Sequence, residues 1–240
     1  GQNRRLRWDA LMLQENNTMT RMVILTEGKS NPDEAKTATG LLRYRPSDVA
    51  AVLDSKKAGR KTGDVLGVGG DIPFIARLAD VEADTLDIGI APAGGKLPEE
   101  WRAVIREAIE RGMDILSGLH YFVSEDPEFV ELANRHGVKL NDVRRPPAEL
   151  TVSKNAAKDS PCHRIHTVGH DCSVGKMVAA LELAGALRAR DRSAEFVATG
   201  QTGIMISGWG SPVDRVISDF VAGAIEEQVL AHQEQEFLFI

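Results

Sequence analysis

The sequence predicts an α/β protein of two domains, each built on a parallel β-sheet. Short β-branched runs alternate with helical patterns along most of the chain, which is the order that crossovers between parallel strands require. The stretch RRPPAELTVSKNAAKDSP has two adjacent prolines and no apolar period, and it divides this alternation in two. We therefore expect domains at residues 20–145 and 161–240, a linker at 146–160, and an extension at residues 1–18.

The first half of the chain shows strand and helix signals in turn. Strands are predicted in RMVILTEG, which ends at Gly28, and in VAAVLDS, DVLGV, TLDIGI, DILSGLH and VKLNDV. Between Gly28 and VAAVLDS lies a polar stretch that contains Gly40 and Pro46 and to which no element is assigned. The segment LPEEWRAVIREAIERGM predicts a helix with Pro98 in its first turn and Gly112 at its end, and DPEFVELANRHG predicts another that ends at Gly137. This pattern is typical of a Rossmann-like domain.

The second half repeats the alternation on a smaller scale. Strands are predicted in RIHTVG, AEFVATG and EFLFI, and helices at 175–190 and 213–232, with a glycine-rich loop before the second helix. A mononucleotide-binding sheet commonly has about five strands or more. We therefore expect the second domain to be incomplete in this chain, truncated on its C-terminal side.

Composition limits the classes of partner. The net charge of −6 leaves no basic excess to neutralise nucleic-acid phosphates. Two cysteines are too few for a disulfide framework and indicate a reducing compartment, and no apolar run approaches the roughly 20 residues of a membrane helix. We expect a cytoplasmic protein that acts on a small molecule, binds neither nucleic acid nor membrane, and forms a homo-oligomer, because symmetric association is common.

The segment TVGHDCSVGKM has the features of a phosphate-binding loop. It follows a predicted strand and opens a helix, and it encloses five residues between its two glycines where the common motif has four. In such loops backbone N–H groups and the helix N-terminus face the phosphates, and the lysine reaches the outer ones. We predict that the loop residues contacting the phosphates are Gly169, Asp171, Cys172, Ser173, Val174, Gly175, Lys176 and Met177.

Met177 stands where a magnesium-binding hydroxyl is usual. A thioether does not hold Mg²⁺, which prefers hard oxygen ligands. The loop therefore predicts a phosphorylated coenzyme that is bound without being cleaved there. Two alternatives stay open: an ATP-dependent ligase or kinase using ATP with Mg²⁺, and a nucleotide-binding protein without chemistry. Cysteines and histidines crowd CHRIHTVGHDC, but a strand and a loop separate them, so we expect no metal site.

Several motifs together resemble a known family. They are TVGHDCSVGKM, ATGQTGIMISGWG and VDRVISDFVAGAIE in the second half and KTATGLLRY, GIAPAGGKLPEEW, GLHYFVSEDPEF and DVRRPP in the first. They resemble a family catalogued as a domain of unknown function, whose characterised members are D-glutamate N-acetyltransferases that use acetyl-CoA. The loop spacing resembles that of dethiobiotin synthetase-like proteins. The resemblance covers roughly residues 20–240 and implies acetyl transfer from acetyl-CoA to D-glutamate or a similar amino acid.

Acetyl transfer needs a base for the amino proton, donors for the thioester oxyanion and a clamp for the acceptor's carboxylates. Arg215, at the start of the last predicted helix, is a candidate clamp, because guanidinium matches carboxylate at two points; the alternative is a surface arginine. Asp214 and Asp219 are candidate bases. They are five apart and do not share one helix face well, and Asp214 equally suits an N-cap or first-turn position.

Other candidates follow predicted strands, at the edge where open α/β sheets bind ligands. Gln201 and Thr202 follow AEFVATG and are expected to contact substrate. Gly94 and Gly95, in APAGGKLP, predict either contact with an anion or the substrate, or a tight turn into a helix. His120 ends DILSGLH, and for it we favour a core or capping position.

Overall fold

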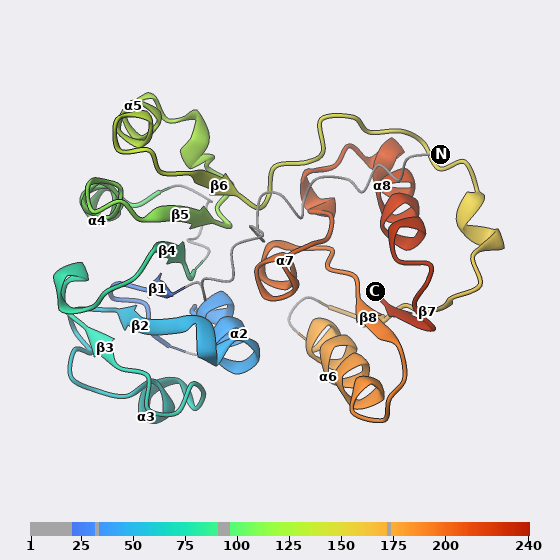
Figure 1. Cartoon of the computed structure of the whole chain (residues 1–240), viewed down its shortest axis with the longest axis horizontal. Helices are drawn as coiled ribbons and strands as arrows, with labels where there is room; N and C mark the ends of the chain where they lie inside the picture. The colour runs from blue at the N-terminus through green and yellow to red at the C-terminus, as the bar shows by residue number, and fades with distance from the viewer. Residues whose placement is uncertain (1–20, 32–33, 91–96, 172–173) are drawn as a thin grey trace. The chain divides into compact units, whose positions relative to one another are not determined.

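The computed structural model describes residues 21–31, 34–90, 97–171 and 174–240 (Figure 1). The described residues up to Arg144 form one compact unit, and those from Arg145 to Ile240 form the other. We call these units the first and second domains. No helix among the described residues has the length and apolar character needed to span a bilayer.

The first domain is built on a six-stranded parallel sheet in the order β3-β2-β1-β4-β5-β6 (Figure 1). The strands are β1 Met22–Leu25, β2 Val49–Leu53, β3 Phe74–Ile75, β4 Thr85–Ile88, β5 Asp114–Ser117 and β6 Leu140–Asp142. This is the strand order of Rossmann folds, so the predicted fold class is confirmed. All four residues of β1 are buried, because helices cover both faces of a parallel sheet.

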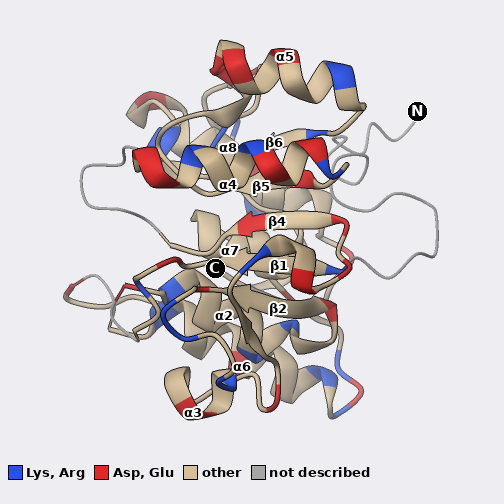
Figure 2. Cartoon of the chain, turned by 90° about the vertical axis from the view of Figure 1, so that its left-hand side faces the viewer, with Lys and Arg blue, Asp and Glu red and all other residues tan. Residues whose placement is uncertain are grey.

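In the described part of this domain, the helices between the strands are α2 Lys36–Tyr44, α3 Thr62–Leu66, α4 Glu99–Glu110 and α5 Pro127–His136. After β1 the chain adds β2 and β3 toward one edge of the sheet, and after β4 it adds β5 and β6 toward the other edge. Right-handed crossovers therefore place α2 on one face of the sheet and α4 and α5 on the other face. The end signals of α5 act as predicted: Asp126 caps its first turn, and Gly137 ends it with a φ of 69°. Basic and acidic residues are interspersed along α4 and α5 (Figure 2).

One predicted strand of the first domain is wrong, and one helix is absent from the prediction. The polar stretch after Gly28 contains α2, which buries Leu41 and Leu42. Thr and Gly residues interrupt the apolar pattern of this helix in the sequence. DVLGV is the end of α3 rather than a strand, because Gly67 closes that helix with a φ of 71°. The third strand of the domain is β3 instead.

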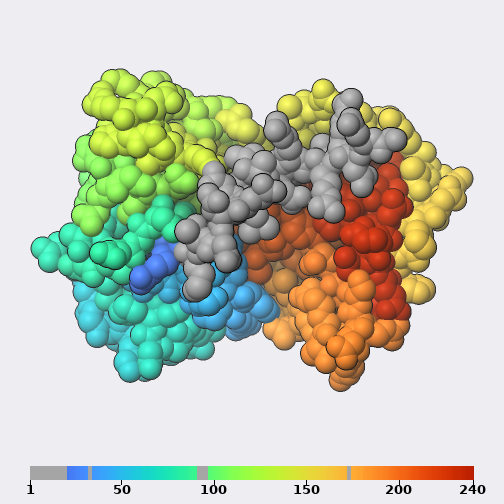
Figure 3. Space-filling model, viewed as in Figure 1, coloured from blue at the N-terminus to red at the C-terminus, as the bar shows by residue number. Residues whose placement is uncertain are grey.

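The second domain holds a three-stranded parallel sheet in the order β7-β9-β8, formed by β7 His163–Ile165, β8 Ala194–Phe196 and β9 Phe237–Phe239. Its helices are α6 Lys176–Arg188, α7 Gln201–Ser207 and α8 Ser218–Ala231, with 3₁₀ turns η5 Ala156–Asp159 and η6 Val213–Arg215. Both α6 (orange) and α8 (red) lie at the surface (Figure 3). The central strand β9 buries Leu238 and Phe239.

Two predictions for this domain also need correction. The glycine-rich loop after β8 begins with α7, which packs so closely that a Cβ on Gly203 would lie 3.0 Å from the Cβ of Ala198. The last long helix begins at Ser218 rather than at residue 213, because Ile217 has an extended ψ of 133° and separates α8 from η6.

The second half of the linker is packed against α8. A Cβ on Gly223 would lie 1.7 Å from the carbonyl oxygen of Thr151, so only glycine lets the two backbones cross here. Three residues further along α8, Glu226 accepts hydrogen bonds from the backbone N–H groups of Lys154 at 2.6 Å and Ala157 at 3.2 Å. The chain from Thr151 onward therefore belongs to the packing of the second domain.

Candidate phosphate-binding site

The loop between β7 and α6 begins over the carboxyl end of β9. The backbone N–H and the hydroxyl of Thr167 both donate to the carbonyl oxygen of Ile240, at 2.9 Å and 3.1 Å. This double contact joins residues 73 positions apart. It fixes the start of the loop to the end of β9. The predicted strand, loop and helix follow one another, as a phosphate-binding loop requires.

Gly169 and Gly175 are needed for different reasons. A Cβ on Gly169 would lie 2.7 Å from Cγ2 of Val174 and 3.3 Å from Cδ of Lys176, so a side chain there would fill the concave side of the loop. Gly175 has open space around it, but its φ of 99° lies in the region that side chains disfavour. Gly169 therefore leaves the concave side of the loop without a side chain of its own, and Gly175 allows the positive φ at which α6 begins.

The N-terminus of α6 has features that favour an anion. Its N-cap residue, Gly175, has no side chain to cap the helix, and its first turn contains no acidic residue. Helix geometry leaves the N–H groups of Lys176, Met177 and Val178 without a carbonyl partner inside the helix. These groups and the helix dipole carry partial positive charge at the mouth of the loop.

The lysine of the motif lies across the loop. The Nζ of Lys176 donates to the carbonyl oxygen of Asp171 at 2.5 Å, while its methylenes pass over Gly169. Asp171 contributes its backbone carbonyl to this contact. Val174 is 45% exposed beside the loop, and Met177 is half-buried in the first turn of α6. The predicted residues Cys172 and Ser173 lie outside the described residues, as do Gly94 and Gly95 of the first domain.

A second group of predicted residues gathers at the carboxyl end of β8. Gly210 pairs with Ala198 just past that strand, and the N–H of Ser211 donates to the carbonyl of Ala198 at 2.8 Å. A Cβ on Gly210 would lie 2.3 Å from the same carbonyl oxygen. This close crossing brings η6 to the edge of the sheet from which α7 starts with Gln201 and Thr202.

The candidate catalytic residues are placed differently from the expectation. Asp214 and Arg215 lie in η6, and the N-cap position of α8 is Ile217, so Asp214 does not cap that helix. Asp219 is exposed in the first turn of α8 and does not share a helix with Asp214. Because β9 lies between β7 and β8, about 10 Å separates the strand ends that carry the phosphate loop and this second group.

The cysteines and histidines around the loop are spread over several environments. Cys162 is a buried thiol in a small core with Val197, Val229 and Leu238. The ring of His163 stacks on Phe237 with centroids 5.3 Å apart. Within the described residues, no group of three or more His, Cys, Asp or Glu side chains is arranged to hold a metal ion.

In the first domain, His120 is exposed on the loop after β5, so the expectation of a core position is wrong.

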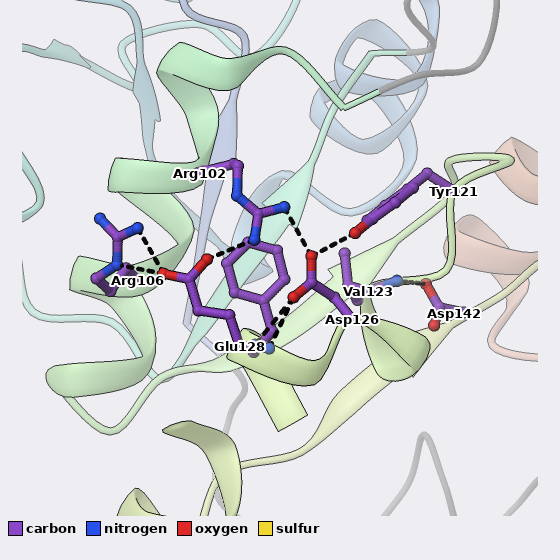
Figure 4. Close-up of polar contacts among 8 residues, drawn as sticks. Arg102, Arg106, Tyr121, Val123, Asp126, Glu128 and Asp142 are labelled. Atoms are coloured by element: carbon purple, nitrogen blue, oxygen red, sulfur yellow. Dashed lines mark hydrogen bonds and ion pairs between the residues drawn. The ribbon is translucent and has the colours of Figure 1, made fainter. Parts of the chain in front are cut away.

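A polar cluster of Arg102, Tyr121 and Asp126, which we did not predict, holds the loop after β5 (Figure 4). Arg102 of α4 donates to Asp126 at 2.6 Å, and Tyr121 donates to the same carboxylate. Burial opposes the ionisation of Asp126, but the hydrogen bonds from Arg102 and Tyr121 lower its pKa to about 2. The one local signal for this cluster is the Asp-Pro pair that opens α5.

Comparison with known proteins gives a consistent picture. A domain model described as the Rossmann-like domain of unknown function DUF1611_N matches residues 55–146, and the P-loop domain of DUF1611 matches residues 151–240. A crystal structure of a DUF1611 family protein from Anabaena variabilis has a TM-score of 0.86 and 35% sequence identity, over 91% of this chain and 65% of that one.

Two curated relatives are named D-glutamate N-acetyltransferase. The protein from Tritonibacter scottomollicae is 38% identical over 192 residues, which cover 80% of this chain and 55% of the relative. The protein from Pseudoalteromonas sp. is 42% identical over 152 residues, which cover 63% of this chain and 45% of the relative. The chain thus spans about half the length of the curated relatives it matches. With both domain models matched and the fold shared, this chain belongs to the DUF1611 family.

Proposed function

We propose that this protein transfers the acetyl group of acetyl-CoA to the amino group of D-glutamate or a similar small amino acid. In this proposal the loop of the second domain binds the phosphates of the coenzyme. The names of the two curated relatives support an acetyltransferase. The geometry of the loop supports a phosphorylated ligand, and its sequence favours one that is not cleaved there.

The observation that carries the proposal is the uncapped N-terminus of α6 beside Lys176, with a thioether at the next position. Coenzyme A carries a pyrophosphate and a 3′-phosphate. The N–H groups at the start of α6, the helix dipole and the ammonium group of Lys176 together stabilise these negative charges without a divalent ion. On binding, Lys176 exchanges the carbonyl of Asp171 for a phosphate oxygen. Met177 supplies no oxygen for Mg²⁺, which disfavours metal-assisted nucleotide hydrolysis.

The reaction sets the remaining requirements for side chains. The amino nitrogen of the acceptor attacks the thioester carbon, the C–S bond breaks, and the amino proton leaves as the thiol forms. Residues of the chain therefore hold the acceptor carboxylates, receive the proton and donate to the oxyanion. In our proposal Arg215 holds a carboxylate, while Gln201 and Thr202 contact the acceptor at the end of β8.

The binding test is calorimetric titration of coenzyme A in the presence of EDTA. Lys176→Ala should weaken binding about 10- to 100-fold, the equivalent of one hydrogen bond to a charged group. Lys158→Ala removes an exposed lysine of the same domain and should leave the affinity unchanged. Equal affinity in wild type and Lys176→Ala would remove the loop from the proposal. Mg²⁺-dependent binding of ATP without binding of coenzyme A would favour a ligase or kinase.

The activity test measures release of free thiol from acetyl-CoA with D-glutamate, L-glutamate and other amino acids as acceptors. The proposal predicts thiol release that depends on an amino acid and is lost in Lys176→Ala at low coenzyme concentration. Tight binding of coenzyme A without turnover of any amino acid would instead indicate a nucleotide-binding protein without this chemistry.

A further inference from the structure

A carboxyl group lies buried in the middle of the first sheet. Asp87 is on β4, between β1 and β5, and is 0% exposed. Its partners in register are Ile24 and Leu116, both apolar. Neither carboxyl oxygen has a hydrogen-bond partner. Buried polar groups in proteins are nearly always hydrogen-bonded, so this side chain calls for an explanation.

Helix α2 covers the face of the sheet that carries Asp87. Gly89 is two residues further along the chain and therefore on the same face. A Cβ on Gly89 would lie 3.1 Å from the Cβ of Ala38 in α2, and the N–H of Ala38 donates to the carbonyl of Gly89 at 2.9 Å. The carboxyl group is thus enclosed between the sheet and this helix, away from water.

The surrounding charges do not pair with Asp87. Strand β1 has no charged residue, and on β5 the side chain of Asp114 accepts a hydrogen bond from the N–H of Lys139 at 2.7 Å. The charged or titratable side chains of α2 and its C-terminal cap are Lys36, Arg43, Tyr44 and Arg45. Of these, Arg45 acts on Asp87 through its charge, but its Nε donates to Asp48 at 2.7 Å.

An ionised carboxylate in such a place loses its hydration and gains no partner, so the neutral form is favoured. Burial raises the pKa of Asp87 to about 7, and the attraction of Arg45 offsets only part of this effect. We propose that Asp87 is a pH-sensitive element of the first domain: it is protonated in the enclosed space between the sheet and α2, and its ionisation as the pH rises weakens the packing of α2 on the sheet.

The sign of the effect follows from linkage. The folded domain binds the proton more tightly than the unfolded chain, in which an aspartate titrates near 4. The stabilisation by protonated Asp87 is therefore complete below about pH 4 and is lost as the pH rises to about 7. Over that range the unfolding equilibrium constant of the first domain should rise about tenfold for each pH unit because of this one group.

The test uses the whole chain labelled for NMR. The carboxyl carbon of Asp87 should titrate near neutral pH, well above the value of about 4 that an aspartate has in an unfolded chain. Titration of Asp87 at or below that value would overturn the proposal. This measurement needs only the wild-type protein, so it decides the matter even if a variant fails to fold.

A second measurement follows unfolding in urea at pH 5, 6, 7 and 8 through the buried methyl groups of Ile24 and Ile115. Asp87→Asn should remove the tenfold change of the unfolding equilibrium constant per pH unit, and its gain in stability over wild type should be largest at the highest pH. Asp64→Asn removes a carboxylate that is exposed on α3, and it should keep the wild-type dependence of stability on pH. An Asp87→Asn profile with the same slope as wild type would also overturn the proposal.

Discussion

Replacement of Gly223 by alanine should destabilise the protein, against the usual trend for helices. Alanine in a helix interior is ordinarily more stable than glycine by about 0.5–1 kcal/mol. In α8, however, the added Cβ would lie 1.7 Å from the carbonyl oxygen of Thr151 and 2.8 Å from its carbonyl carbon. Both are backbone atoms that no rotamer change can move, so the linker must shift.

The size of the effect follows from two opposing terms. Overpacking costs about 1–3 kcal/mol, and a contact this short with a backbone belongs at the upper end of that range. The gain in helix propensity offsets about 1 kcal/mol, so we expect a net loss of about 2 kcal/mol. The hydrogen bonds from Lys154 and Ala157 to Glu226 should weaken as well, because the same segment moves.

The matched control is Gly185→Ala in α6, where the added Cβ meets nothing within 4 Å. This variant should gain about 0.5–1 kcal/mol. Urea unfolding followed by circular dichroism measures both variants, and amide exchange at Lys154 and Ala157 reports on the linker. If Gly223→Ala is more stable than wild type, as is expected for Gly185→Ala, then the backbone of Thr151 does not cross α8 at Gly223.

Three further predictions concern the two domains. Gly169→Ala should weaken coenzyme A binding about tenfold in calorimetry, because its Cβ would lie 2.7 Å from Val174; an unchanged affinity would mean that the loop is open elsewhere. Arg215→Ala should raise the KM for the acceptor in the thiol-release assay and leave coenzyme affinity unchanged; an effect on coenzyme affinity alone would contradict its role. Asp126→Ala should cost about 1–2 kcal/mol at pH 7 through loss of the α5 cap. Since the folded pKa of Asp126 is depressed to about 2, this difference should shrink in urea unfolding as the pH falls from about 4 to 2.

The elements that could be predicted from sequence are those whose signals are local. Strands β1, β2 and β4 are short apolar runs with turn residues behind them, and α4 and α5 carry their start and stop residues within the helix itself. Helices α2 and α7 were missed because glycine and threonine interrupt their apolar period. Their stability comes from the sheet that they cover, which a window of neighbouring residues does not contain.

The candidate site divides in the same way. Gly169, Gly175 and Lys176 were predicted because the spacing of a phosphate-binding loop is a property of consecutive backbone groups. The placement of Asp214 and Arg215 could not be predicted, because the start of α8 depends on how the segment before it packs on Ala198.

By itself, then, the sequence determined the alternation of strands and helices, the division into two domains and the glycine-lysine loop, because all three depend on residues close together in the chain. Only the tertiary structure decided that Thr167 holds the carbonyl of Ile240, that Thr151 crosses α8 at Gly223 and that Asp87 is enclosed without a partner. Each of these contacts or environments joins distant segments, and burial is a property of the packed chain rather than of any one residue.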